Sequence, residues 1–142
     1  MVKIELEIIL EKMAALQGYY KELKGLEHIS FEEYMQNNLY KRTVERIIQL
    51  IVEAATDINN MLLKSLDKGP TVDYYSSFIE LAEAGILPVE FAISIAPSAG
   101  LRNIIVHEYQ KIDDRKVHSS IKYTLDYYLK YMKLINDYLK IT

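Results

Sequence analysis

The sequence predicts an all-α fold, an up-and-down bundle of about five helices that forms a single domain over residues 1–142. Apolar residues recur at spacings of three and four along most of the chain, as on the buried side of an amphipathic helix. The chain has only five glycines and three prolines, and no stretch shows the alternation of a half-buried strand. Half of the residues are apolar, so a chain of this length can bury one core.

The first helix is expected over residues 2–24, where Gly25 ends the apolar pattern. Ser30 and Glu33 have the spacing of a capping box, which predicts that a second helix begins there and runs to about Leu66. The apolar positions of the first helix are Leu6, Ile9, Met13, Leu16, Tyr20 and Leu23.

The second helix carries two stripes, one apolar and one polar. The apolar stripe, expected to be buried, consists of Val44, Ile47, Ile48, Ile51, Ala55, Ile58 and Leu62. The opposite polar stripe consists of Arg42, Arg46, Gln49, Glu53, Asp57 and Asn60. Such a stripe is usually a solvated surface, although it can also line a contact between subunits.

Turn residues set the next boundaries. Gly69 and Pro70 indicate a turn, after which a third helix is expected over about 72–84. Gly85 can adopt the left-handed conformation that ends a helix, and Pro88 suits the first turn of a fourth.

Pro97 predicts a kink or break in that fourth helical segment, because its ring would clash with the carbonyl of Ile93. The helix is expected to resume at Ser98, and a last helix is expected over about 114–140. The apolar positions of the last helix are Val117, Ile121, Leu125, Tyr128, Met132, Ile135 and Leu139.

Charge is unevenly distributed along the chain, whose formal net charge is −3. Residues 102–142 hold 8 Lys and Arg against 5 Asp and Glu, a net charge of +3, so a polyanion would prefer this end. No apolar run is expected to reach the roughly 20 residues that span a bilayer, and the acidic, amphipathic N-terminus does not resemble a secretion signal. We therefore expect a cytoplasmic protein. Without cysteines it forms no disulfides and no thiolate metal sites.

The segment RNIIVHEY gathers four polar side chains of catalytic type. If it is a helix, Arg102 and Tyr109 lie only about 20° apart around the axis, and Asn103 and His107 stack one turn apart beside them. One arc of about 160° would then present a cation, an amide, an imidazole and a phenol. The helix can also end near His107.

This set of side chains suits a phosphodiester substrate. Arg102 offers a planar fork of donors that matches phosphate oxygens, and His107 can take or give a proton near neutral pH. Asn103 can orient the imidazole or a substrate hydroxyl. Cleavage of RNA needs both a base and an acid, so two copies of the motif across a two-fold axis are a natural arrangement. The alternative is that these side chains only form hydrogen bonds at a helix end.

The motif RNIIVHEY resembles that of the HepT toxins, a branch of the HEPN ribonuclease superfamily. Arg102, His107 and Tyr109 fit the three defining positions of R-X4-H-X-Y. The resemblance continues in the stretches VERIIQLIVEAATDI (44–58), FIELAEAGILP (78–88) and QKID after the motif, and it covers about residues 1–139. Pro97 before the motif and Glu108 within it depart from the pattern, and a carboxylate beside His107 could repel phosphate.

The resemblance implies a helical homodimer whose motifs form a composite, metal-independent endoribonuclease site, with no cofactor. Arg102, Asn103 and His107 would be the catalytic residues. It also implies a minimal nucleotidyltransferase antitoxin that transfers AMP to Tyr109. The alternative function is a non-catalytic module that docks on a nucleotidyltransferase and regulates it.

Other polar residues give weaker predictions. Lys111, Arg115 and Lys116, with Lys122, form a basic cluster that could contact the RNA backbone. His28 is expected to be exposed in a loop and His118 to lie on a solvated helix surface. The abundant tyrosines are expected mainly in core and interface packing, and no metal-binding pattern of Glu and His is present.

Overall fold

The computed structural model describes residues 3–141, and of residues 4 and 141 it describes the backbone alone. Every regular element in this range is helical. The elements in chain order are α1 (Lys3–Lys24), α2 (Phe31–Gln36), α3 (Asn38–Ser65), α4 (Tyr74–Glu83), α5 (Val89–Ile95), α6 (Ser98–His107), the 3-10 turn η1 (Tyr109–Lys111) and α7 (Asp114–Ile141).

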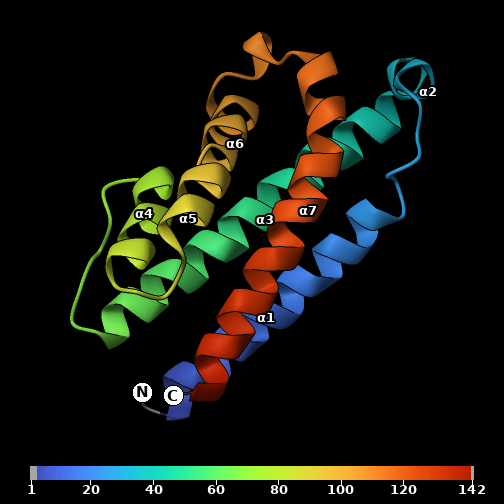
Figure 1. Ribbon diagram of the computed structural model, residues 1–142. Helices are drawn as coiled ribbons and strands as arrows, with labels where there is room; N and C mark the ends of the chain where they lie inside the picture. The colour runs from blue at the N-terminus through green and yellow to red at the C-terminus, as the bar shows by residue number, and fades with distance from the viewer. Residues whose placement is uncertain (1–2, 142) are drawn as a thin grey trace.

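The bundle is built around α3, which packs against α1, α4, α6 and α7. The long helices α1 and α7 lie on one side of α3, whereas α4, α5 and α6 form a compact group on its other side (Figure 1). The apolar stripe predicted on α3 is buried throughout. The predicted up-and-down bundle is confirmed, although it contains more helices than expected.

The helix predicted from Ser30 to about Leu66 is wrong as a single helix, because it is interrupted at Asn37. The capping box of Ser30 and Glu33 is present and begins α2. The backbone of Asn37 is not helical. Its side-chain oxygen accepts hydrogen bonds from the backbone N–H groups of Leu39 and Tyr40, at 2.9 and 3.3 Å. An asparagine N-cap thus starts a new helix, α3.

The break predicted at Pro97 is confirmed, since α5 ends at Ile95 and α6 begins at Ser98. Gly85 has the left-handed φ of +80° that was expected at the end of α4. From the sequence, no apolar run long enough to span a bilayer is expected. By length and composition alone, however, the segment Val89–His107 could cross a membrane. It is nevertheless two helices that pack against α3, α4 and α7.

Tyrosines fill much of the core, as predicted: Tyr34, Tyr128 and Tyr131 have no exposed surface. The Tyr131 hydroxyl donates to Asn59 Oδ1 at 2.6 Å and also lies 3.1 Å from the carbonyl oxygen of Ala55. Asn59 in turn donates to Ser77 Oγ at 3.0 Å. This buried network joins α3, α4 and α7, which fixes the group of helices that carries the motif.

Candidate functional site

Arg102 lies on α6 with only 12% of its side chain exposed, and its guanidinium is held from three sides. Nε and Nη2 donate to Glu53 Oε2 on α3 at 3.0 and 2.6 Å, and Nη1 donates to Asn103 Oδ1 at 3.2 Å. The guanidinium carbon lies 4.3 Å from the centre of the ring of Tyr74, on α4. Gln49 donates to the same oxygen of Glu53 at 3.1 Å.

These contacts use only part of the hydrogen-bonding capacity of the guanidinium. Arginine has five N–H donors, and Glu53 and Asn103 occupy three of them. One N–H on each terminal nitrogen remains, enough for two hydrogen bonds to phosphate oxygens. The guanidinium of Arg102, whose plane is already fixed by these contacts, can therefore bind a phosphate.

His107 is the last residue of α6 and is exposed. Glu108 caps the helix with its backbone N–H on the carbonyl of Ile104, and its carboxylate pairs with Lys111 at 3.4 Å. Among residues 3–141 no hydrogen bond joins His107 to Arg102 or Asn103. In the single chain the imidazole is thus open to an incoming partner or substrate.

Of the two possibilities that the sequence left open, the structure shows the helix ending at His107, so Tyr109 begins η1 and does not share an arc of α6 with Arg102. The turn directs its hydroxyl to Glu45 on α3, where it donates to Oε1 at 2.9 Å. Tyr109 remains 50% exposed, whereas Glu45 is only 5% exposed. Three motif residues therefore lie on the helix and its end, and the fourth lies on the turn that follows.

Burial raises the pKa of Glu45 above its ordinary value, although the hydrogen bond from Tyr109 acts in the opposite direction. The same hydrogen bond is the main reason why the pKa of Tyr109 is raised. Each raised pKa favours the protonated form of its own group. The phenol of Tyr109 is therefore neutral at neutral pH.

Sequence reasoning missed Glu45 and Tyr74, and it assigned Glu53 to the polar stripe without finding its partner. A signal for Glu45 was present, because its position on α3 lies beside the apolar stripe, next to Val44 and one turn before Ile48. An acidic residue at such a position needs a polar partner. The identity of that partner, across 64 residues of chain, could not be read from the sequence.

The predicted RNA-contacting residues Lys111, Arg115 and Lys116 all lie at the surface. Lys111 pairs with Glu108, and the guanidinium of Arg115 lies 4.1 Å from the ring centre of Phe31. No contact in the described part of the chain draws them together into one pocket.

The two other histidines differ in their surroundings. The exposure predicted for His28 is confirmed, with 95% of its side chain exposed. The solvated surface predicted for His118 is wrong: its Nε2 lies 2.6 Å from the carbonyl oxygen of Ile29, and its ring packs against Phe31 and Tyr34. His118 therefore joins α7 to the start of α2.

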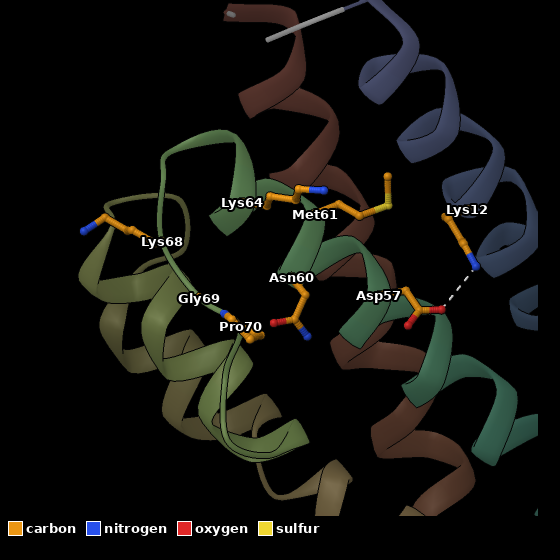
Figure 2. A pocket seen from close by; sticks show the side chains of 8 residues that line it. All are labelled: Lys12, Asp57, Asn60, Met61, Lys64, Lys68, Gly69 and Pro70. Atoms are coloured by element: carbon orange, nitrogen blue, oxygen red, sulfur yellow. Dashed lines mark hydrogen bonds and ion pairs between the residues drawn. The ribbon is translucent and has the colours of Figure 1, made fainter.

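A hollow of about 680 Å³ is lined by α1, the second half of α3 and the loop that follows α3, and by no residue of α6 (Figure 2). Its lysines are Lys12, Lys64 and Lys68, and Lys12 pairs with Asp57 at 3.1 Å. No group of three or more His, Asp or Glu side chains within the described range could hold a metal ion.

Comparison with known proteins identifies the family of the chain. The family model described as ribonuclease HepT-like matches residues 5–135. The chain is also 40% identical to the tRNA nuclease HepT of Aphanizomenon flos-aquae, covering 98% of this chain and 95% of that protein. The chain belongs to the ribonuclease HepT-like family. A second family member, the mRNA nuclease HepT of Shewanella oneidensis, is 26% identical and covers 79% of this chain and 84% of its own length.

Solved structures share the fold. A tri-AMPylated HEPN toxin of Shewanella oneidensis, in complex with MNT antitoxin, superposes with a TM-score of 0.83 at 23% identity, covering 96% of this chain and 99% of that one. The cytosolic protein YutE of Bacillus subtilis, of unknown function, gives 0.76 at 16% identity, with 92% and 90% covered. The bundle described above is therefore the fold of HEPN toxins.

Proposed function

We propose that this protein is a metal-independent endoribonuclease toxin that acts in the cytoplasm. The observation that carries the proposal is a guanidinium of fixed orientation and an exposed imidazole on one ten-residue helix, α6, of a ribonuclease HepT-like chain. Arg102 holds the scissile phosphate, His107 transfers a proton, and Asn103 orients Arg102 through its side-chain oxygen.

The reaction needs no group beyond those of the protein and the RNA. The ribose 2′-oxygen attacks phosphorus while a base removes its proton, and the bond to the 5′-oxygen breaks as an acid protonates it. The products are a 2′,3′-cyclic phosphate and a 5′-hydroxyl. Arg102 balances the charge that builds up on the phosphorane oxygens.

A homodimer supplies the second proton-transfer group. One imidazole cannot easily serve as base and acid in the same step, and one chain has a single His107 at the motif. Two exposed imidazoles facing one another across a two-fold axis provide one of each. Lys111, Arg115 and Lys116 are then placed to contact the RNA backbone beyond the scissile phosphate.

An antitoxin of the minimal nucleotidyltransferase type silences the enzyme by transferring AMP to Tyr109. Support comes from the half-exposed hydroxyl, two residues after His107, and from the solved neighbour that carries AMP groups in complex with MNT antitoxin. The added nucleotide brings a negative phosphate and a bulky base next to the imidazole, and it competes with RNA for the cation of Arg102. Intact mass after co-expression should show AMP additions that map to Tyr109.

The direct test is incubation of the purified chain with RNA in the presence of EDTA. Cleavage should persist and leave 2′,3′-cyclic phosphate ends, and His107→Ala should abolish it without changing the circular dichroism spectrum. Cleavage that survives this substitution, or that EDTA removes, contradicts the proposal.

A non-catalytic docking module is the second candidate, because the charge of Arg102 is already balanced by Glu53 in the single chain. Expression of the chain alone separates the two functions. A toxin arrests growth, and Arg102→Ala relieves the arrest. A docking module copurifies with its nucleotidyltransferase and leaves growth unaffected.

A further inference from the structure

The hydroxyl of Tyr109 is bound to a carboxylate that lies outside the motif. We propose that Glu45 is the general base for the modification of Tyr109, taking the phenolic proton as the oxygen attacks a nucleoside triphosphate. The inference rests on the proposed function, in which Tyr109 accepts AMP. The two side chains come from α3 and from the turn after α6, and the hydrogen bond between them is 2.9 Å long.

The hydrogen bond distinguishes Tyr109 from other tyrosines at the surface. Tyr75, Tyr109 and Tyr123 are 45%, 50% and 59% exposed, so a partner enzyme could reach any of them. Of these three, Tyr109 is the one whose hydroxyl donates to a carboxylate in the structure. Exposure alone does not select a tyrosine for modification, whereas exposure together with a bound base does.

The geometry suits nucleophilic attack. The single proton of the hydroxyl is directed to the buried carboxylate, so the lone pairs of the oxygen are left for an electrophile arriving from solvent. A base within hydrogen-bond distance of the proton that it removes is the first requirement of general base catalysis.

The step balances without an oxidant or reductant. A bond forms between the oxygen of Tyr109 and the α-phosphorus of ATP, the bond from that phosphorus to the bridging oxygen breaks, and pyrophosphate leaves. The phenolic proton moves to Oε1 of Glu45, which becomes a neutral carboxylic acid. The antitoxin supplies the ATP site and its metal ions, and Glu45 supplies the proton acceptor.

Burial makes Glu45 a suitable acceptor. Burial disfavours the charged form of a carboxyl group, so protonation relieves the cost of desolvation. This is why the pKa of Glu45 is raised. A neutral acid also does not repel the new phosphodiester, as a carboxylate would. The ionisable groups around Glu45 are Lys41 and Arg42 on α3, Asp114 on α7, Tyr34 on α2, and Tyr109 itself.

The test compares the rate of AMP transfer in three variants. Each purified chain is mixed with the nucleotidyltransferase antitoxin, ATP and Mg²⁺, and incorporation is followed by intact mass. Glu45→Gln keeps the size and an acceptor oxygen but loses basicity, so the kcat of transfer should fall about 100-fold while KM for ATP is unchanged. Tyr109→Phe should show no incorporation.

A matched control lies on the same helix. Asp57→Asn makes the same chemical change about 18 Å further along α3, where the carboxylate pairs with Lys12 (Figure 2). Its rate of AMP transfer should equal that of the wild type. Circular dichroism and thermal midpoints check that all three variants are folded.

The outcomes separate this inference from the proposed function. If the wild-type chain gains no AMP at Tyr109, the proposed modification is wrong and Glu45 has no such role. If the wild type is modified and Glu45→Gln is modified at the same rate, the inference alone is overturned.

A measurement on the wild type tests the inference without any substitution. With a carboxylate as base, the rate of transfer should level off once Glu45 is ionised and then stay nearly constant up to about pH 9. A rate that rises tenfold with each pH unit indicates that free phenolate is the nucleophile, and overturns the inference.

Discussion

Two carboxylates on α3 serve the two ends of the motif, and they do so in opposite ways. Glu53 binds a guanidinium that is always charged, and the pair is fixed by Gln49, Asn103 and Tyr74. Glu45, eight residues earlier and about 12 Å away along the helix, binds a neutral phenol that remains half exposed. The group that binds charge is held rigidly, whereas the phenol that we propose as the modified group stays accessible from solvent.

The same difference separates Arg102 from His107. Arg102 lies mid-way along α6, where neighbouring helices can surround it, and His107 lies where α6 ends. A cation that stabilises a transition state gains from a fixed orientation. An imidazole that completes a site with a second copy has to be open on one side. Several substitutions can test this division of roles.

The largest effect is expected for Arg102→Lys. A lysine cannot donate to Glu53 and a phosphate as a planar fork, so RNA cleavage should fall about 100-fold while the charge is retained. Steady-state cleavage of a labelled RNA measures this. Activity within twofold of the wild type would show that a point charge suffices and that the fixed plane of the guanidinium is unimportant.

Glu53→Gln should have the next largest effect. It removes the charge that holds Arg102, so cleavage should fall about tenfold and the free energy of unfolding by about 2 kcal/mol. Asp57→Asn is again the matched control, since its pair with Lys12 is 54% and 42% exposed and contributes little. Equal denaturation midpoints for the two variants would contradict the structural role of Glu53.

Glu45→Gln should alter stability in a pH-dependent way. Because burial raises the pKa of Glu45 above 4.5, the carboxyl stabilises the fold at low pH, and this contribution is lost as pH rises through the raised pKa. Glutamine has no charge to desolvate, so the variant should melt about 2 °C higher than the wild type at pH 7. The difference should shrink as pH falls through the raised pKa of Glu45 and be lost by about pH 4.5, and a difference that grows over this range instead would contradict the account.

The smallest effect is expected in the basic cluster. Lys116→Ala should weaken RNA binding about threefold and lower the slope of log affinity against log salt by about one. Lys64→Ala, in the hollow of Figure 2, is the control and should leave both quantities unchanged. Equal losses in the two variants would mean that the RNA does not follow the motif side of the bundle.

Local pattern predicted most of the fold. Helix ends at Gly25, Gly85 and Pro97 follow from backbone preferences that depend on one or two residues, and the buried stripe of α3 follows from its spacing. The break at Asn37 was missed because the apolar pattern continues on both sides of it. The competing cap depends on one amide side chain.

The candidate site was only half predictable, for a physical reason. The motif supplied Arg102, Asn103, His107 and Tyr109. The carboxylates that bind Arg102 and Tyr109 lie far away in the sequence, 49 residues for Glu53 and 64 residues for Glu45. Such pairs are set by helix packing, which spacing along one helix does not encode. His118 was misread for the same reason, because its partners come from α2 and the loop before it.

The central claim is that two imidazoles, one from each chain, act in one site. It is tested most directly by purifying, through two different tags, a heterodimer of a wild-type chain and a His107→Ala chain. If the composite site needs both imidazoles, this heterodimer should cut RNA hardly better than the doubly substituted dimer. A heterodimer with half of the wild-type activity would show that each chain cuts RNA alone, which contradicts the account.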